Sequence, residues 1–196
     1  MSDSERSANG FSQLGEEGRF EGWAIRVVEG TYMGPDGSVF KRDVVRHPGA
    51  VAVVPVTDHK TALLVRQYRA PLDRFILEIP AGTRDVHGEP SEVTAHRELA
   101  EEVGMRATTL RPLGRIYNTP GFCDEVTDLY MATGLTPCAT ARSGIEELHM
   151  QVVEVPLDAP REWLSGPDPV DAQSVLGLML VIQTLNEQDS IPHEGG

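Results

Sequence analysis

The stretch from Gly82 to Met105 holds the residues of this chain whose spacing is best suited to chemistry. On an α-helix, which turns by about 100° per residue, Glu98, Glu101 and Glu102 fall within an arc of roughly 100°. The opposite side is expected to pack on a sheet and carries Val93, His96, Leu99, Ala100 and Val103. Carboxylates this close repel one another unless a cation lies among them. Mg²⁺ prefers oxygen ligands and completes its shell with water and phosphate oxygens, so the stretch predicts a metal site that handles phosphates.

A charged helix face is more often simply solvated, so the flanking residues must decide between the two interpretations. Gly82 and Glu89 precede the helix at fixed offsets, and Gly104 follows it as a C-cap. The pattern resembles the Nudix box, G-x5-E-x7-R-E-U-x-E-E-x-G-U, in which U is aliphatic. Every fixed position from Glu89 to Met105 matches. The one departure is that six residues instead of five separate Gly82 from Glu89, in a loop that tolerates an insertion.

The overall composition excludes several classes of function. Hydrophobic residues make up 40% of the 196 residues and charged residues 24%, as is ordinary for a globular protein. The formal net charge of −13 argues against non-specific nucleic-acid binding, for which a basic surface is needed. No apolar run is long enough for a membrane span, and the start of the chain lacks a signal-peptide core. Cys123 and Cys138 have no metal-like spacing, which favours a reducing, cytoplasmic location.

The sequence divides into a mobile N-terminus, an N-terminal β element, a catalytic domain and a mobile tail, at residues 1–17, 18–48, 49–190 and 191–196. Within the β element, strand patterns at 23–28 and 39–45 flank a turn at 33–37. A lone hairpin is only marginally stable in water. We therefore expect this element to pack on the main domain or on a second subunit.

The catalytic segment combines strands and helices without strict alternation. Strands are predicted at residues 50–56, 62–69, 75–82, 109–117, 126–135 and 148–155. Helices are predicted at residues 90–103, 158–164 and 171–186. This order favours an α/β (α+β) fold, an α/β/α sandwich with a mixed central sheet, over a doubly wound parallel fold. The Nudix resemblance implies the same sandwich.

Segments outside the box are similar to one branch of the Nudix hydrolases, the ADP-ribose and nucleotide-sugar pyrophosphatases. Residues 66–69 and 78–82 resemble its R-Q-x-R and E-x-P-A-G segments. Residues 117–125 resemble its Y-x-S-P-G-F-S-D-E loop, although threonine and cysteine replace the two serines. Pro120 lies sixteen positions after Gly104, which is the usual placement in this branch. The N-terminal β element resembles the small swapped domain of these homodimers, so a homodimer is implied.

The resemblance also implies a set of metal ligands. Mg²⁺, with Mn²⁺ as an alternative, would be bound by three side chains and one backbone carbonyl, those of Glu98, Glu101, Glu102 and Ala81. Glu102 is in addition expected to be essential for catalysis. Arg97 would instead pair with Glu89 and hold the loop against the helix, and Glu78 is expected to be structural.

Further residues are expected to bind the substrate. Arg66 and Arg69 would bind its phosphates, because a guanidinium group matches phosphate oxygens, although a solvated strand end is an equal alternative. The loop containing Pro120 and Gly121 is expected to contact the substrate. An adenine needs an aromatic partner, for which the candidates are Trp23, Phe40 and Phe122.

The general base is expected in the loop before the last strand, where Glu146 and Glu147 are the candidates and Glu147 is slightly favoured. The implied reaction is attack of a metal-activated water on the pyrophosphate bond of ADP-ribose, which gives AMP and ribose 5-phosphate. Related nucleoside diphosphate sugars are equally compatible with these motifs. Two other functions are considered. A non-hydrolytic ADP-ribose sensor would be expected to lose acids from the box, and a housecleaning nucleoside triphosphate pyrophosphatase would be expected to lack the Pro120 loop and the β element.

Overall fold

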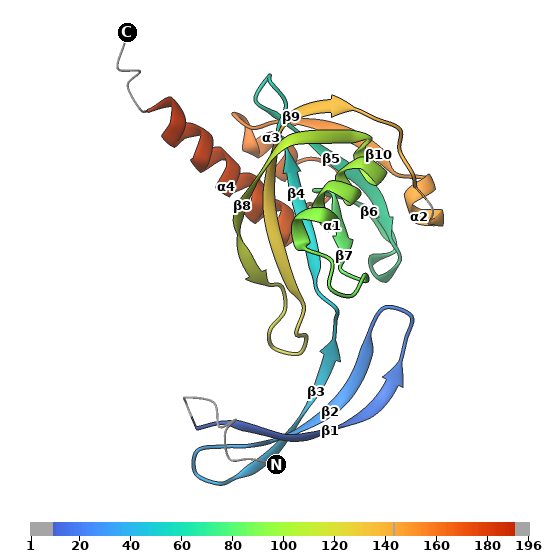
Figure 1. Cartoon of the computed structure of the whole chain (residues 1–196), viewed down its shortest axis with the longest axis vertical. Helices are drawn as coiled ribbons and strands as arrows, with labels where there is room; N and C mark the ends of the chain where they lie inside the picture. The colour runs from blue at the N-terminus through green and yellow to red at the C-terminus, as the bar shows by residue number, and fades with distance from the viewer. Residues whose placement is uncertain (1–9, 143, 191–196) are drawn as a thin grey trace. The chain divides into compact units, whose positions relative to one another are not determined.

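The computed structural model describes residues 10–142 and 144–190, which form two compact units (Figure 1). The first unit comprises residues 10–49 together with Tyr117–Val126. The second comprises Ala50–Ile116 and the chain from Thr127 onward. Within the described ranges, no helix combines the length and the apolar character that crossing a membrane requires. The predicted tail at 191–196 lies outside the described residues.

The first unit contains an antiparallel sheet of order β1-β2-β3, formed by Ser12–Glu21, Arg26–Met33 and Val39–Arg46. The sequence pattern predicts only a hairpin of two strands here, so strand β1 was not predicted. It begins inside the segment that was expected to be mobile, of which residues 1–9 lie outside the description. Strand β2 begins at Arg26 and not at Trp23, because the Gly22 N–H donates to the Ile25 carbonyl at 2.9 Å and closes a turn.

The segment Tyr117–Val126 is bound to strand β3 of the first unit. The Val45 N–H donates to the Phe122 carbonyl at 2.7 Å, and the Asp124 N–H donates to the Val45 carbonyl at 3.1 Å. The Arg46 guanidinium adds an ion pair to Asp124 at 3.0 Å. The sequence-based boundaries place this segment in the catalytic domain, whereas its contacts in the structure lie with the N-terminal strands.

The second unit contains two sheets. One is mixed and has the order β7-β4-β9-β8, because β4 pairs parallel with β9 and antiparallel with β7. The other is antiparallel and has the order β10-β5-β6. The strands β4 to β10 span Ala50–Pro55, Thr61–Arg69, Arg74–Glu78, Ala81–Thr83, Met105–Tyr117, Val126–Pro137 and Gln151–Pro156.

Helices cover both faces of the strands in this unit. They are α1, the π-helical turn η3, α2, α3 and α4, at Ser91–Glu98, Leu99–Val103, Ile145–Leu148, Pro160–Leu164 and Ala172–Asp189, besides the short 3₁₀ turn η2 at Ala70–Leu72. Side chains of β4 alternate between two cores, as expected for a strand buried on both faces. Val51 and Val53 pack with α1, whereas Ala52 and Val54 pack with α4. The predicted α/β/α sandwich with a mixed sheet is therefore confirmed.

The helix of the acidic motif runs through α1 and η3, as predicted for residues 90–103. It ends at Gly104, which adopts φ +72° and donates its N–H to the Ala100 carbonyl at 3.1 Å. The expected packing face is partly wrong, because Val93 and His96 are exposed. Helix α2 lies in a segment that the sequence pattern predicts as a loop.

Candidate functional site

Two of the three acids in the motif are buried. Glu98 is 8% exposed and Glu102 is 6% exposed, whereas Glu101 is half-buried. The sequence pattern predicts the acids on the side away from the core. In the structure Glu98 and Glu102 lie on the buried side together with Ala95 and Leu99. Glu98 and Glu102 therefore face the protein interior and not bulk solvent.

The backbone of strand β7 contacts both buried carboxylates. The Ala81 N–H donates to Glu102 Oε2 at 3.0 Å. A Cβ atom at Gly82 would lie only 2.0 Å from Cδ of Glu98, so no larger residue fits there without moving the acid. The extra residue between Gly82 and Glu89 therefore does not displace this glycine from the acids.

Burial and mutual repulsion strongly perturb these two acids. Burial raises the pKa of Glu98 to about 7, against the opposing effect of the Arg97 charge. Burial raises the pKa of Glu102 to about 8, repulsion from Glu98 adds to the rise, and the Ala81 N–H opposes it. Two adjacent carboxylates with raised pKa values form a site that a cation would stabilise in its ionised form.

Arg97 lies among the acids of the motif. Its guanidinium is 3.7 Å from Glu89, so the predicted ion pair is present. It is also 2.7 Å from Glu98 and 3.3 Å from Glu101. Glu98 and Glu101, two of the expected metal ligands, are therefore both paired with an arginine in this structure.

The donor set fits a hard divalent cation that shares its shell with substrate. Among the side chains that the structure describes, no group of three or more His, Cys, Asp or Glu is arranged to hold a metal by itself. Mg²⁺ does not need such a cage, since it is usually held by one or two carboxylates, water and phosphate oxygens. Glu98 and Glu102 provide two such carboxylates.

Helix α2 distinguishes the two candidate bases. Glu147 is half-buried, and its charge contributes to the raised pKa values of both Glu98 and Glu102. Glu146 is exposed, and its charge acts instead on Tyr68, whose pKa is raised mainly by a hydrogen bond to Asp73. Of the two, Glu147 is thus the one that acts on the buried acids.

Both candidate phosphate-binding arginines are paired within the protein. Arg66 makes two hydrogen bonds to Asp168, at 2.6 and 3.1 Å, and its guanidinium lies 4.2 Å from the centre of the Phe75 ring. Arg69 pairs with the buried Glu78 at 2.7 Å, in agreement with a structural role for Glu78. The charge of Arg69 also opposes the rise in the pKa of Glu102. Arg69 therefore lies close enough to Glu102 to act on it electrostatically.

Comparison with known proteins identifies the family. Residues 46–165 match the model of the NUDIX domain. The chain belongs to the NUDIX family. It is 36% identical to an ADP-ribose pyrophosphatase of Bacillus subtilis over 84% of this chain and 89% of the relative. It is 35% identical to a methanol dehydrogenase activator of Bacillus methanolicus, over 89% and 92%. The crystal structure of an ADP compounds hydrolase superposes with a TM-score of 0.79 at 25% identity, covering 92% of this chain and 97% of that one.

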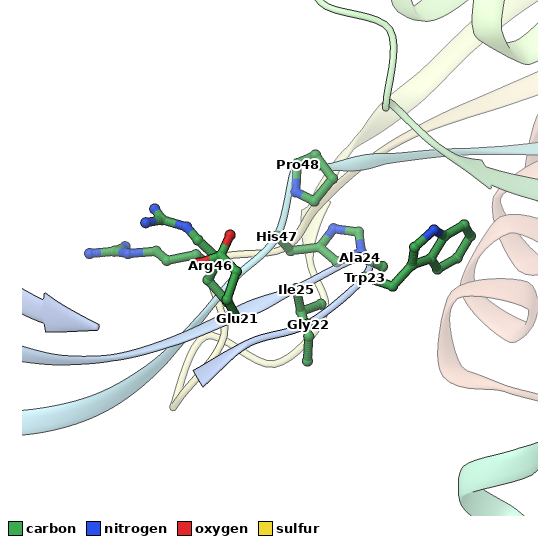
Figure 2. A pocket seen from close by; sticks show the side chains of 9 residues that line it. Glu21, Gly22, Trp23, Ala24, Ile25, Arg46, His47 and Pro48 are labelled. Carbon is green, nitrogen blue, oxygen red and sulfur yellow. The ribbon is translucent and has the colours of Figure 1, made fainter. Parts of the chain in front are cut away.

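The remaining substrate-binding candidates of this NUDIX protein lie in the first unit, in two cavities. Trp23 is fully exposed and lines a cavity of about 330 Å³, in which its indole and the His47 ring extend to the side opposite Arg46 (Figure 2). Pro120 and Gly121 line a separate cavity of about 370 Å³. The residues Phe40, Phe122, Tyr32 and Tyr117 supply the aromatic side chains of this second cavity.

Sequence patterns miss two residues that support the site of the NUDIX domain. The Ser174 hydroxyl accepts the Ile79 N–H at 2.8 Å, just before strand β7, and is fully buried. Arg142 binds two backbone carbonyls, at Glu102 and Met150. Neither residue belongs to a motif, because each acts on backbone groups that are distant in the sequence.

Proposed function

We propose that this NUDIX hydrolase cleaves the pyrophosphate bond of ADP-ribose, or of a related nucleoside diphosphate sugar, with AMP and ribose 5-phosphate as the products from ADP-ribose. The observation that carries the proposal is the buried pair Glu98 and Glu102 beside strand β7, whose raised pKa values call for a cation. The names of the similar proteins, an ADP-ribose pyrophosphatase and an ADP compounds hydrolase, support the substrate class.

The same acids would hold Mg²⁺ or, as an alternative, Mn²⁺. Glu98 and Glu102 would provide side-chain ligands, the Ala81 carbonyl would provide a backbone ligand, and Glu101 would join them. Arg97 would have to release both Glu98 and Glu101. When bound, the ion lowers the pKa of a water and neutralises charge on the departing phosphate. The Ala81 N–H, which donates to Glu102 Oε2 at 3.0 Å, would hold the Glu102 carboxylate in place.

Glu147 is the proposed general base, because its charge acts on both buried acids while that of Glu146 acts on Tyr68. A base must come within hydrogen-bond distance of the water it deprotonates, directly or through one water. The half-buried position of Glu147 on α2 suits this role.

Candidate substrate-binding residues are proposed in each unit separately. In the second unit, Arg66 would release Asp168 and Arg69 would release Glu78, so that both guanidinium groups bind the substrate phosphates. In the first unit, Trp23, Pro120 and Gly121 are the proposed substrate-binding residues. The candidates for stacking on the adenine are Trp23, Phe40 and Phe122.

We also propose that the protein is a cytoplasmic homodimer. Large apolar side chains are exposed along the β1-β2-β3 sheet, and they are those of Leu14, Phe20 and Val39. Exposed apolar side chains can mark an interface, and a second copy of the chain would cover these. Sedimentation analysis gives the molecular mass directly, and a monomer at micromolar concentration would contradict this part of the proposal.

The activity is tested with ADP-ribose, ADP-glucose, GDP-mannose and nucleoside triphosphates, with the products identified by mass. We expect AMP from ADP-ribose in the presence of Mg²⁺ and no product after chelation. Glu102→Gln should lose most turnover, whereas the exposed control Glu92→Gln should keep it. Tight ADP-ribose binding without AMP would favour the sensor, and faster cleavage of triphosphates would favour the housecleaning enzyme.

A further inference from the structure

The guanidinium of Arg142 joins two parts of the second unit. Its Nε and Nη2 donate to the Glu102 carbonyl at 3.0 and 2.5 Å, and its Nη1 donates to the Met150 carbonyl at 2.7 Å. Glu102 lies in the last helical turn, where carbonyls lack partners within the helix. Met150 directly precedes strand β10. The segment between Arg142 and Met150 includes α2, so the guanidinium closes the base of the loop that carries Glu147.

Helix α2 is short and exposed, and its capping hydrogen bond, from the Gly144 N–H to Glu147 Oε2 at 3.5 Å, lies within its own turn. It spans four residues, none of which is buried, and Ile145 and Leu148 are 81% and 64% exposed. A helix this short is not stable on its own, and here apolar packing does not compensate. The chain before the loop is tied to the acidic helix, because the Cys138 N–H donates to the Gly104 carbonyl at 2.8 Å. Beyond that point, the Ala141 N–H donates to the Glu101 carbonyl at 3.4 Å, and Arg142 adds a side-chain link to the same helix.

Arg142 also connects the two groups that would have to act together. Glu102 is held at its carbonyl by Arg142 and at its carboxylate by the Ala81 N–H. Met150, whose carbonyl accepts from Arg142, donates its N–H to the Glu147 carbonyl at 3.1 Å, so the Arg142 bridge contributes to the position of Glu147 relative to Glu102. A lysine has no planar fork and cannot reproduce all three hydrogen bonds.

We propose that Arg142 is a positioning residue that fixes α2 so that the Glu147 carboxylate faces Glu98 and Glu102. This inference rests on the proposed role of Glu147 as the base. Misplacing a reacting group by about 1 Å can cost about 100-fold in rate. Loss of the bridge should therefore lower kcat and leave substrate affinity nearly unchanged.

The experiment measures kcat, KM and Tm with ADP-ribose and saturating Mg²⁺ for Arg142→Ala, Arg142→Lys, Glu147→Gln and the double variant Arg142→Ala/Glu147→Gln. We expect kcat of Arg142→Ala to fall by about 10- to 100-fold with KM changed less than about threefold. Arg142→Lys should lie in between. Millimolar guanidinium should partly restore Arg142→Ala and not Glu147→Gln. Arg161→Ala removes an exposed arginine of α3 and should match the wild type.

The double variant separates the two proposals. If Arg142 acts through Glu147, the double variant should be about as slow as Glu147→Gln alone, because effects of residues that act as a unit are not additive. Multiplicative losses, or wild-type kcat in Arg142→Ala, would overturn the positioning role. Wild-type turnover in Glu147→Gln would instead reject Glu147 as the base, and the positioning role with it, while leaving the hydrolase activity intact. If Arg142→Ala does not fold, Arg142→Lys decides: unchanged kcat overturns the inference, and lowered kcat at wild-type Tm supports it.

Discussion

Replacing Glu102 by glutamine should stabilise the metal-free protein while it inactivates the enzyme. Glu102 is 6% exposed, and its carboxylate accepts a hydrogen bond from the Ala81 N–H. Glutamine has nearly the same shape, stays neutral at every pH, and offers a carbonyl oxygen to the same N–H. The substitution therefore removes the cost of ionising a buried group and leaves the packing almost unchanged.

The size of this effect follows from the pKa values. Glu102 has a pKa of about 8 in the folded protein and an ordinary value of 4.5 when unfolded. Because the folded-state pKa is raised, the folded state binds more protons than the unfolded state between these values, and stability falls as pH rises through this window. Relative to a neutral side chain, the penalty is about 1 kcal/mol at pH 5.5, about 3 kcal/mol at pH 7 and about 5 kcal/mol at pH 9. Relaxation of the ionised carboxylate toward water should reduce these values by about half.

Urea unfolding in the presence of a chelator at pH 5.5, 7 and 9 measures the difference in the free energy of unfolding between Glu102→Gln and the wild type. We expect the variant to gain stability and the gain to grow with pH. Saturating Mg²⁺ at pH 9 should then stabilise the wild type more than the variant, since ligand binding to the folded state adds to stability. A variant that is less stable than the wild type at pH 9 without metal, or a gain independent of pH, would refute the assigned burial and repulsion. Glu92→Gln, an exposed change on the same helix, should show no gain.

Two further substitutions test residues that support the site. Gly82→Ala places a methyl group within 2.0 Å of Glu98 and should lower kcat by about 100-fold. The control Gly15→Ala meets no atom within 4 Å and should leave kcat unchanged. A fully active Gly82→Ala would contradict the close approach. Ser174→Ala leaves the buried Ile79 N–H without its acceptor and should cost about 1–3 kcal/mol in urea unfolding, and an unchanged midpoint would show that this hydrogen bond is replaced.

The acidic motif could be found from the sequence because its signals are local. Helical spacing gathers Glu98, Glu101 and Glu102, and Gly104 marks the helix end through its left-handed φ of +72°. A strand was predicted at residues 50–56 from their apolar, valine-rich run, and the side chains of β4 there alternate between two cores. These features depend on periodicity and backbone preference, which are properties of short segments.

Other features depend on partners that are distant in the sequence. Arg66 pairs with Asp168, 102 positions away, and no local sequence pattern predicts that pair. Arg69 pairs with Glu78, which competes with its expected role toward phosphate. The different environments of Glu146 and Glu147 follow from how α2 lies on the fold, since both residues have the same type and occupy adjacent positions.

Strand β1 could not be found from hydrophobic alternation, because nearly all of its side chains are exposed. Its pairing with β2 is made through backbone hydrogen bonds, and a polar sequence carries no signal of these. Similarly, the attachment of Tyr117–Val126 to β3 depends on backbone groups of Val45 and on one ion pair of Arg46.

The attachment of Tyr117–Val126 to strand β3 bears on how this polypeptide responds to cleavage. The chain passes between the two units near Gly49, near Tyr117 and near Val126, so three covalent connections link them. A protease cut at Gly49 alone would sever one connection, and the N-terminal fragment would stay bound through the Val45 and Asp124 hydrogen bonds. A protein expressed without residues 1–49 would instead lack Val45 and Arg46. The Phe122 carbonyl and the Asp124 carboxylate would then lose these partners. A protein that is cut after Gly49 and a protein that lacks residues 1–49 should therefore behave differently, although the chain is interrupted at the same place in both.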